Sequence, residues 1–190
     1  MTTYDVLGGP GRDTPRRVPR RLLAVLAVLA ALAWSGDRWA QARELDQLVT
    51  AARTTEVVVG ASAESLRSLQ EYQSAALGGP GSPALRASLR GNLGHDAARW
   101  TPQVDEQRRA VAAVWVLPWH GGLRRARAAY LARVRSWSQY LSQVQLDPAQ
   151  RRGQRPNLRH DRDTAADALA AIAGDRRDVA RLTTALRGGG

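Results

Sequence analysis

Three histidines are the residues of this chain best suited to hold a metal ion or to transfer protons. His95, His120 and His160 lie far apart, and none belongs to an H-E-x-x-H motif or to a Glu-x-x-His pair. Cysteine is absent, which excludes thiolate metal sites and a cysteine nucleophile. We therefore expect no metal ion and no other cofactor.

Serine nucleophiles and paired carboxylates are the other routes to catalysis, and neither has a supporting pattern. The chain has no G-x-S-x-G motif, and an S-x-x-K pair is impossible because lysine is absent. The candidate acid pairs, such as Asp105 and Glu106, lie at helix starts or solvated positions, where acids complement the helix dipole. We expect that the protein is not an enzyme and has no catalytic residue.

The segment Trp115–Gly122 (WVLPWHGG) is the most distinctive part of the chain. It can serve as a docking surface, with Trp119 and His120 as polar donors and Arg124 beside them for an anion. It can also be a simple turn between helices in which Trp119 fills the core. We favour the turn, because at 100° per residue Trp119 falls on the same face as the next predicted helix's apolar stripe.

Arginine supplies every one of the 28 basic residues, against 17 acidic ones. From residue 120 onward, fourteen arginines and six aspartates give +8, most of the net charge of +11. This basic region can bind anionic lipid headgroups or an envelope polymer, or it can be a solvated face. Its candidate contacts are Arg124, Arg125, Arg135, Arg151, Arg152, Arg155 and Arg159.

An apolar run near the N-terminus follows a basic arm. Residues 1–21 carry five arginines and two aspartates and no apolar periodicity, which predicts a disordered arm. Leu22 to Trp34 is uncharged, and the uncharged stretch extends to Gly36. Arginines before an apolar run keep the N-terminus in the cytoplasm, so the sequence predicts a single-pass bacterial membrane protein with its C-terminal domain outside. Exclusive use of arginine, with abundant alanine and glycine, is typical of a GC-rich bacterial genome.

Two fates of residues 22–36 remain open. As a helix, fifteen residues span about 22 Å, less than a hydrocarbon core of about 30 Å, although snorkelling arginines and interfacial tryptophans can compensate. The alternative is a signal peptide cleaved after Ala33, because Ala31-Leu32-Ala33 fits the A-x-A cleavage pattern. We favour the uncleaved anchor, whose partner is the lipid bilayer.

Residues 37–187 read as a bundle of long amphipathic helices. Apolar residues recur at three- and four-residue steps over 37–77, over 83 to about 118 with Thr101 capping a restart at Pro102, over 122–145, and from Asp163 or Thr164 to Arg187. No strand pattern is present. The fold class is therefore all-α, with the N-terminal membrane helix followed by an antiparallel bundle of three to four helices and a flexible tail at 188–190.

Together these features predict a membrane-anchored, extracytoplasmic helical bundle with a binding or scaffolding role at the bacterial cell envelope. Its partner can be an unidentified protein, and the coiled-coil-like stripes also allow a homo-oligomer. Two alternatives stay open: a secreted helical protein after signal cleavage, and a basic nucleic-acid-binding protein whose apolar run is buried. Export makes nucleic acid the less available partner.

Overall fold

The computed structural model describes residues 20–77, 83–147 and 158–188, and these residues form helices and no strand. Five helices follow one another: α1 (Arg20–Leu77), α2 (Pro83–Ala113), α3 (Gly121–Leu146), α4 (Leu158–Ala173) and α5 (Arg177–Gly188). The predicted all-α class is confirmed. The contacts divide the chain into two units, Met1–Trp39 and Ala40–Gly190.

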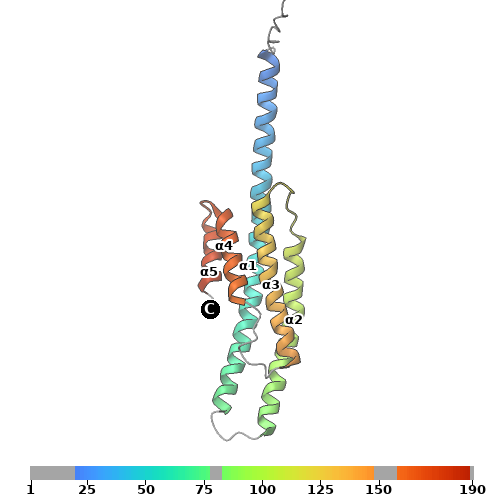
Figure 1. Ribbon diagram of the computed structural model, residues 1–190, viewed down its shortest axis with the longest axis vertical. Coiled ribbons are helices and arrows are strands. Elements are labelled where there is room, and N and C mark those ends of the chain that lie inside the picture. The colour runs from blue at the N-terminus through green and yellow to red at the C-terminus, as the bar shows by residue number, and fades with distance from the viewer. Residues whose placement is uncertain (1–19, 78–82, 148–157, 189–190) are drawn as a thin grey trace, which may run out of the picture. The chain divides into compact units, whose positions relative to one another are not determined.

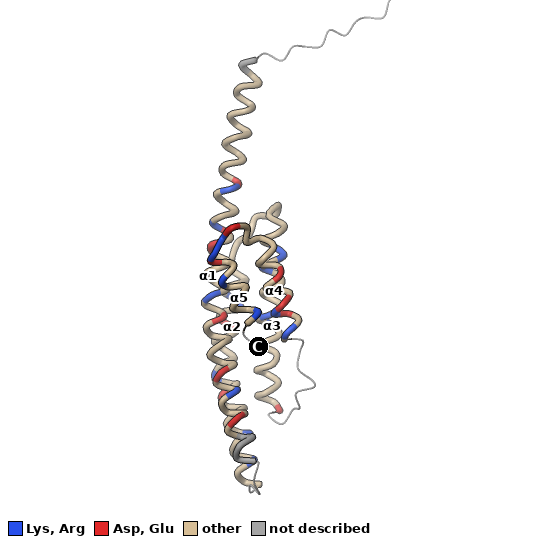
Figure 2. Tube along the Cα trace, turned by 90° about the vertical axis from the view of Figure 1, so that its left-hand side faces the viewer, with Lys and Arg blue, Asp and Glu red and all other residues tan. Residues whose placement is uncertain are grey.

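The unit up to Trp39 contains the start of α1, which is uncharged from Leu22 to Gly36 (Figure 2). Its large apolar side chains, from Leu22 to Leu32, are each at least half exposed. By length and composition, this apolar helix could cross a membrane. Two exposed tryptophans, Trp34 and Trp39, follow the run, and the Arg38 guanidinium lies 5.2 Å from the centre of the Trp34 ring.

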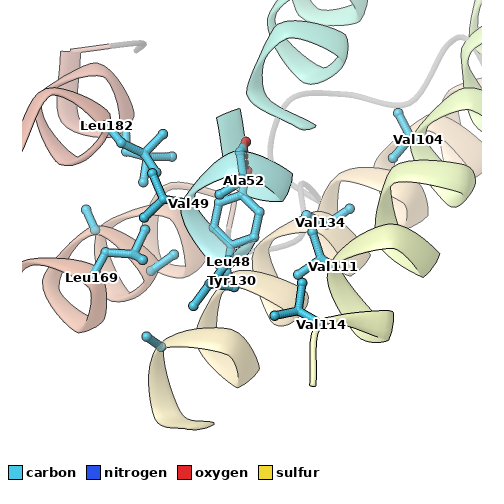
Figure 3. Packing of buried hydrophobic residues seen from close by; sticks show 14 of the residues in the cluster. Leu48, Val49, Ala52, Val104, Val111, Val114, Tyr130, Val134, Leu169 and Leu182 are labelled. Carbon is cyan, nitrogen blue, oxygen red and sulfur yellow. Dashed lines mark hydrogen bonds between the residues drawn. The ribbon is translucent and has the colours of Figure 1, made fainter. Parts of the chain in front are cut away.

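The unit from Ala40 is a helical bundle in which each helix runs antiparallel to the one before it (Figure 1). Helix α3 packs against both α2 and α4, and α5 packs against α4. Figure 3 shows Tyr130 of α3 among Leu48 and Ala52 of α1 and Val134 of α3. Tyr130 is fully buried, which fits the stripe predicted for residues 122–145.

Helix α2 is one helix that passes through Pro102 without a break. The expectation that Thr101 caps a restart is wrong. Its hydroxyl instead donates a hydrogen bond of 2.8 Å to the Ala97 carbonyl one turn earlier, a position open to threonine within a helix.

The last predicted helix is two helices in the structure. Helix α4 begins at Leu158, earlier than the expected Asp163 or Thr164, and ends before Gly174. Gly174 has a φ of +50°, in the left-handed region where glycine carries no Cβ penalty.

Arg176 follows in the turn, where its Nη2 atom lies 2.5 Å from Asp46 of α1 and 2.7 Å from Asp178 of α5. The hydrogen bond from Arg176 lowers the pKa of Asp178 to about 2.

Candidate functional site

The connection between α2 and α3, residues 114–120, is here called the elbow. Its first residues alternate between inside and outside: Val114 and Val116 are buried, and Trp115 between them is 69% exposed. Such alternation is what an extended backbone produces, because successive side chains point to opposite sides. Val116 thus packs the elbow onto the core while the Trp115 indole projects outward.

Trp119 is also exposed, at 67%. The expectation that it fills the core as a continuation of the α3 stripe is wrong. Helix α3 begins only at Gly121, so the rotation of 100° per residue does not extend back to Trp119. Its ring meets the His120 imidazole edge to face, with 6.1 Å between the ring centres.

His120 is buried and is held by a carboxylate of α1. Its Nδ1 atom lies 2.7 Å from Glu44 Oε2, and both side chains are less than one-tenth exposed. The other Glu44 oxygen, Oε1, accepts a hydrogen bond of 3.1 Å from the Leu117 backbone N–H. An ionised carboxylate only accepts hydrogen bonds, so beside ionised Glu44 the Nδ1 atom of His120 carries the proton.

Two arginines of α3 fix the backbone of the elbow from the other side. Arg127 donates to the Val114 carbonyl and Arg124 donates to the Pro118 carbonyl, over 2.5 and 3.1 Å. With the two bonds of Glu44, four of the seven elbow residues are tied by side chains of α1 or α3. The elbow is therefore a rigid support that presents two exposed indoles.

The structure brings together only some of the predicted contact residues. Trp115, Trp119, His120 and Arg124 share the elbow or the first turn after it, and exposed Arg125 follows Arg124. Arg135 lies ten residues further along α3, about 15 Å by helical rise, and exposed Arg159 lies on α4. Arg151, Arg152 and Arg155 fall outside the described residues.

Glu44 is the residue of this site that sequence reasoning missed. The H-E-x-x-H and Glu-x-x-His patterns join residues at most four positions apart, whereas Glu44 and His120 are 76 residues apart in the chain. A signal was present, because Glu44 precedes Thr55 by eleven residues and Ser62 by eighteen. These spacings place the acid on the buried stripe of α1, where an unpaired carboxylate is costly.

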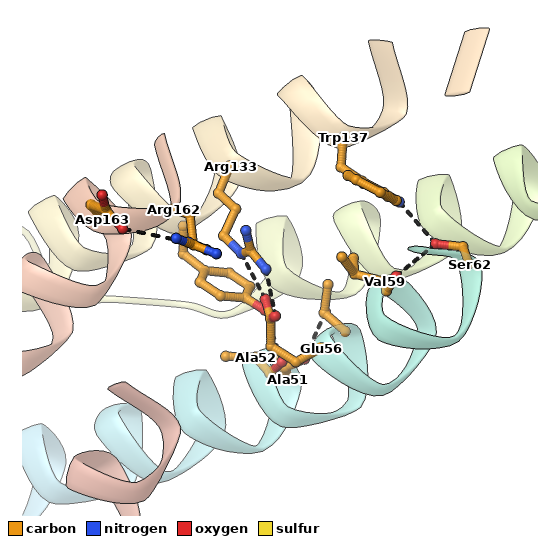
Figure 4. Close-up of polar contacts among 11 residues, drawn as sticks. Ala51, Ala52, Glu56, Val59, Ser62, Arg133, Trp137, Arg162 and Asp163 are labelled. Carbon is orange, nitrogen blue, oxygen red and sulfur yellow. Dashed lines mark hydrogen bonds and ion pairs between the residues drawn. The ribbon is translucent and has the colours of Figure 1, made fainter. Parts of the chain in front are cut away.

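A second polar cluster joins α1 and α3 deeper in the bundle (Figure 4). Arg133 donates to both oxygens of Glu56, at 2.8 and 2.6 Å. The Tyr130 hydroxyl lies 2.7 Å from Glu56 and 2.8 Å from the Ala52 carbonyl. Burial raises the pKa of the Tyr130 phenol well above 10.0, and the charge and hydrogen bond of Glu56 raise it further. Trp137 donates to Ser62 over 2.9 Å.

These contacts are suited to fixing the register of α1 against α3. A bidentate arginine–carboxylate pair has a defined geometry and forms at one helix register only.

Within the described residues, no cluster of histidine and acidic side chains could hold a metal ion. His95 lines an open surface depression with Arg90 and Gln145, and His160 is exposed on α4.

Comparisons of the chain with protein-family models, with curated proteins and with solved structures find no match.

Proposed function

We propose that this protein is a membrane-anchored helical bundle that acts by binding or scaffolding on the outer side of a bacterial cytoplasmic membrane, without catalysing a reaction. The observation that carries the proposal is the exposure of the apolar run. Leu22, Leu26, Leu29 and Leu32 are 50–63% exposed, whereas bundle leucines such as Leu48, Leu123 and Leu141 are almost completely buried.

This exposure has a large energetic consequence in water. Burial of one leucine side chain contributes about 1.5–3 kcal/mol, so a run of exposed leucines and valines requires an apolar environment. A lipid bilayer supplies that environment, and Arg20 and Arg21 at the start of the run favour a cytoplasmic N-terminus. The nucleic-acid alternative needs the same run to be buried within the protein.

The binding role is supported by the elbow. A rigid segment that presents two exposed indoles beside arginines is typical of recognition surfaces, where tryptophan and arginine are enriched. The buried Glu44–His120 pair has a structural use in this account, because it satisfies the Leu117 N–H and orients the segment.

Extraction of cell membranes at alkaline pH tests the anchoring. We expect the full chain to stay in the membrane pellet and the double variant Leu26→Arg/Leu29→Arg to appear in the supernatant, because charged residues at the centre of a span oppose insertion. Leu146→Arg is the matched control, since Leu146 is an exposed leucine of the bundle, and it should stay in the pellet. Release of the unmodified chain would contradict the proposal.

A further inference from the structure

The two indoles of the elbow are held in place by the protein rather than packed into it. Trp115 and Trp119 are about two-thirds exposed, whereas Val114, Val116 and His120 around them are buried. Tryptophan in such a position offers a wide apolar surface. Such a surface suits the interface between lipid tails and water, where tryptophan is enriched in membrane proteins.

The chain connects the elbow to the end of the apolar run by a short path. Glu44 holds the elbow through the Leu117 N–H and His120, and Glu44 is seven residues after Asp37. Seven residues span at most about 25 Å even when fully extended. Covalent connection therefore keeps Glu44, which is hydrogen-bonded to the elbow, within that reach of Asp37, where the uncharged run ends.

The charge beside the indoles suits a phospholipid surface. Arg124 and Arg125 lie in the first turn of α3, immediately after the elbow, and both are exposed. Arginine near a bilayer is attracted to anionic headgroups and hydrogen-bonds phosphate oxygens. The elbow and the start of α3 thus carry aromatic residues suited to a membrane interface and cations suited to phosphate groups.

We propose that the elbow is a second membrane contact, in which Trp115 and Trp119 enter the headgroup layer of the bilayer that holds the apolar run. The inference rests on the proposed function, because it requires the run to lie in a membrane. It adds that the bundle is docked on the bilayer surface at the elbow and is not suspended freely from its anchor.

Single fluorescent labels on the full chain test this contact in vesicles of phosphatidylcholine and phosphatidylglycerol. The chain has no cysteine, so Gly121→Cys, Gly91→Cys and Val28→Cys each give one labelling site. A Cβ added at Gly121 or Gly91 meets no atom within 4 Å, and both positions are exposed, so each can take a cysteine for labelling. The label is a nitrobenzoxadiazole group. The quencher is a lipid with a nitroxide near its headgroup for the labels at Gly121 and Gly91, and a lipid with a nitroxide deep in its tails for the label at Val28.

We expect quenching at Gly121 beside the elbow and none at Gly91 on α2. Quenching at Gly121 should be lost in the Trp115→Ser/Trp119→Ser background, and circular dichroism should show that this variant retains its helix content. Quenching at Val28 without quenching at Gly121 would overturn the docking and leave the anchor intact. Quenching at Gly121 that survives the loss of both tryptophans would also overturn the docking. No quenching at Val28 by a nitroxide placed deep in the tails would instead overturn the anchor itself.

Discussion

Glu44 is the residue on which the geometry of the elbow depends most. It is buried, and its two oxygens serve two separate partners, the Leu117 N–H and His120. Removing the carboxylate leaves buried His120 and the half-buried Leu117 N–H without this acceptor, and the loss of an acceptor by a buried polar group costs about 1–3 kcal/mol. The pair thus links the position of a loop to a helix that is distant in the sequence.

We predict that Glu44→Ala lowers the free energy of unfolding by about 2–4 kcal/mol. His120→Ala should also destabilise, and the double variant should cost clearly less than the sum of the two, because both changes break the same contact. Urea denaturation of the full chain in detergent micelles measures the three values. Glu64→Ala is the control, since its ion pair with Arg67 is exposed and contributes little. Strict additivity of the two main changes would exclude direct coupling.

Tyr130 gives the bundle a dependence on alkaline pH. Its pKa is raised in the folded protein, first by burial and then by the charge of Glu56. Well below pH 10 the phenol is protonated in both the folded and the unfolded protein, so it contributes nothing to the dependence of stability on pH. Above pH 10 the unfolded chain loses this proton while the folded protein retains it, so stability falls until the pH passes the folded pKa.

We predict that the melting temperature falls between pH 10 and 11.5 and that Tyr130→Phe makes this fall shallower. The variant also loses the hydroxyl's bonds, so at neutral pH it should be less stable by about 1–2 kcal/mol. Tyr72→Phe is the control, because Tyr72 is 61% exposed. An unchanged alkaline slope in Tyr130→Phe would show that another group causes it.

Among the elements, the turn between α4 and α5 depends on one backbone conformation. Gly174 occupies positive φ, which residues with a Cβ adopt at a cost of about 1–2 kcal/mol. We predict that Gly174→Ala destabilises the bundle by about that amount in thermal unfolding. Gly91→Ala is the matched control and should stabilise the bundle, because Gly91 lies within α2 in open space and alanine favours a helix. Equal effects of the two substitutions would contradict this role of Gly174.

The elements also show what periodicity can and cannot predict. The buried stripe positions Leu48, Thr55 and Val134 follow from helical spacing alone, because one continuous helix carries each set. The exposed position of Trp119 does not follow from helical spacing, because the rotation of 100° per residue applies only within a helix and α3 begins after Trp119. The split at Gly174 escaped prediction because the apolar spacing continues across it from Leu169 to Val179. Glu44 and His120 were joined only by tertiary packing, which spacing within one helix does not report.

At the scale of the whole molecule, the chain pairs an exposed apolar run with a bundle that carries charges of both signs. The basic region from residue 120 is partly neutralised by ion pairs with acids of α1, including Arg133 with Glu56 and Arg176 with Asp46. Arg124 and Arg125 are exposed beside the elbow and are the cations of the proposed docking surface. In this account the N-terminal arginines orient the chain, the run anchors it, and the elbow supplies its binding surface.

The topology of the chain in living cells tests most directly whether the bundle lies outside the cytoplasm. Single cysteines at Thr3 in the N-terminal arm and at exposed Gln139 on α3 can be probed in spheroplasts with a membrane-impermeant maleimide. We predict that Gln139→Cys is labelled in intact spheroplasts and that Thr3→Cys is labelled only after lysis. Labelling of Gln139→Cys only after lysis would place the bundle in the cytoplasm and contradict the account.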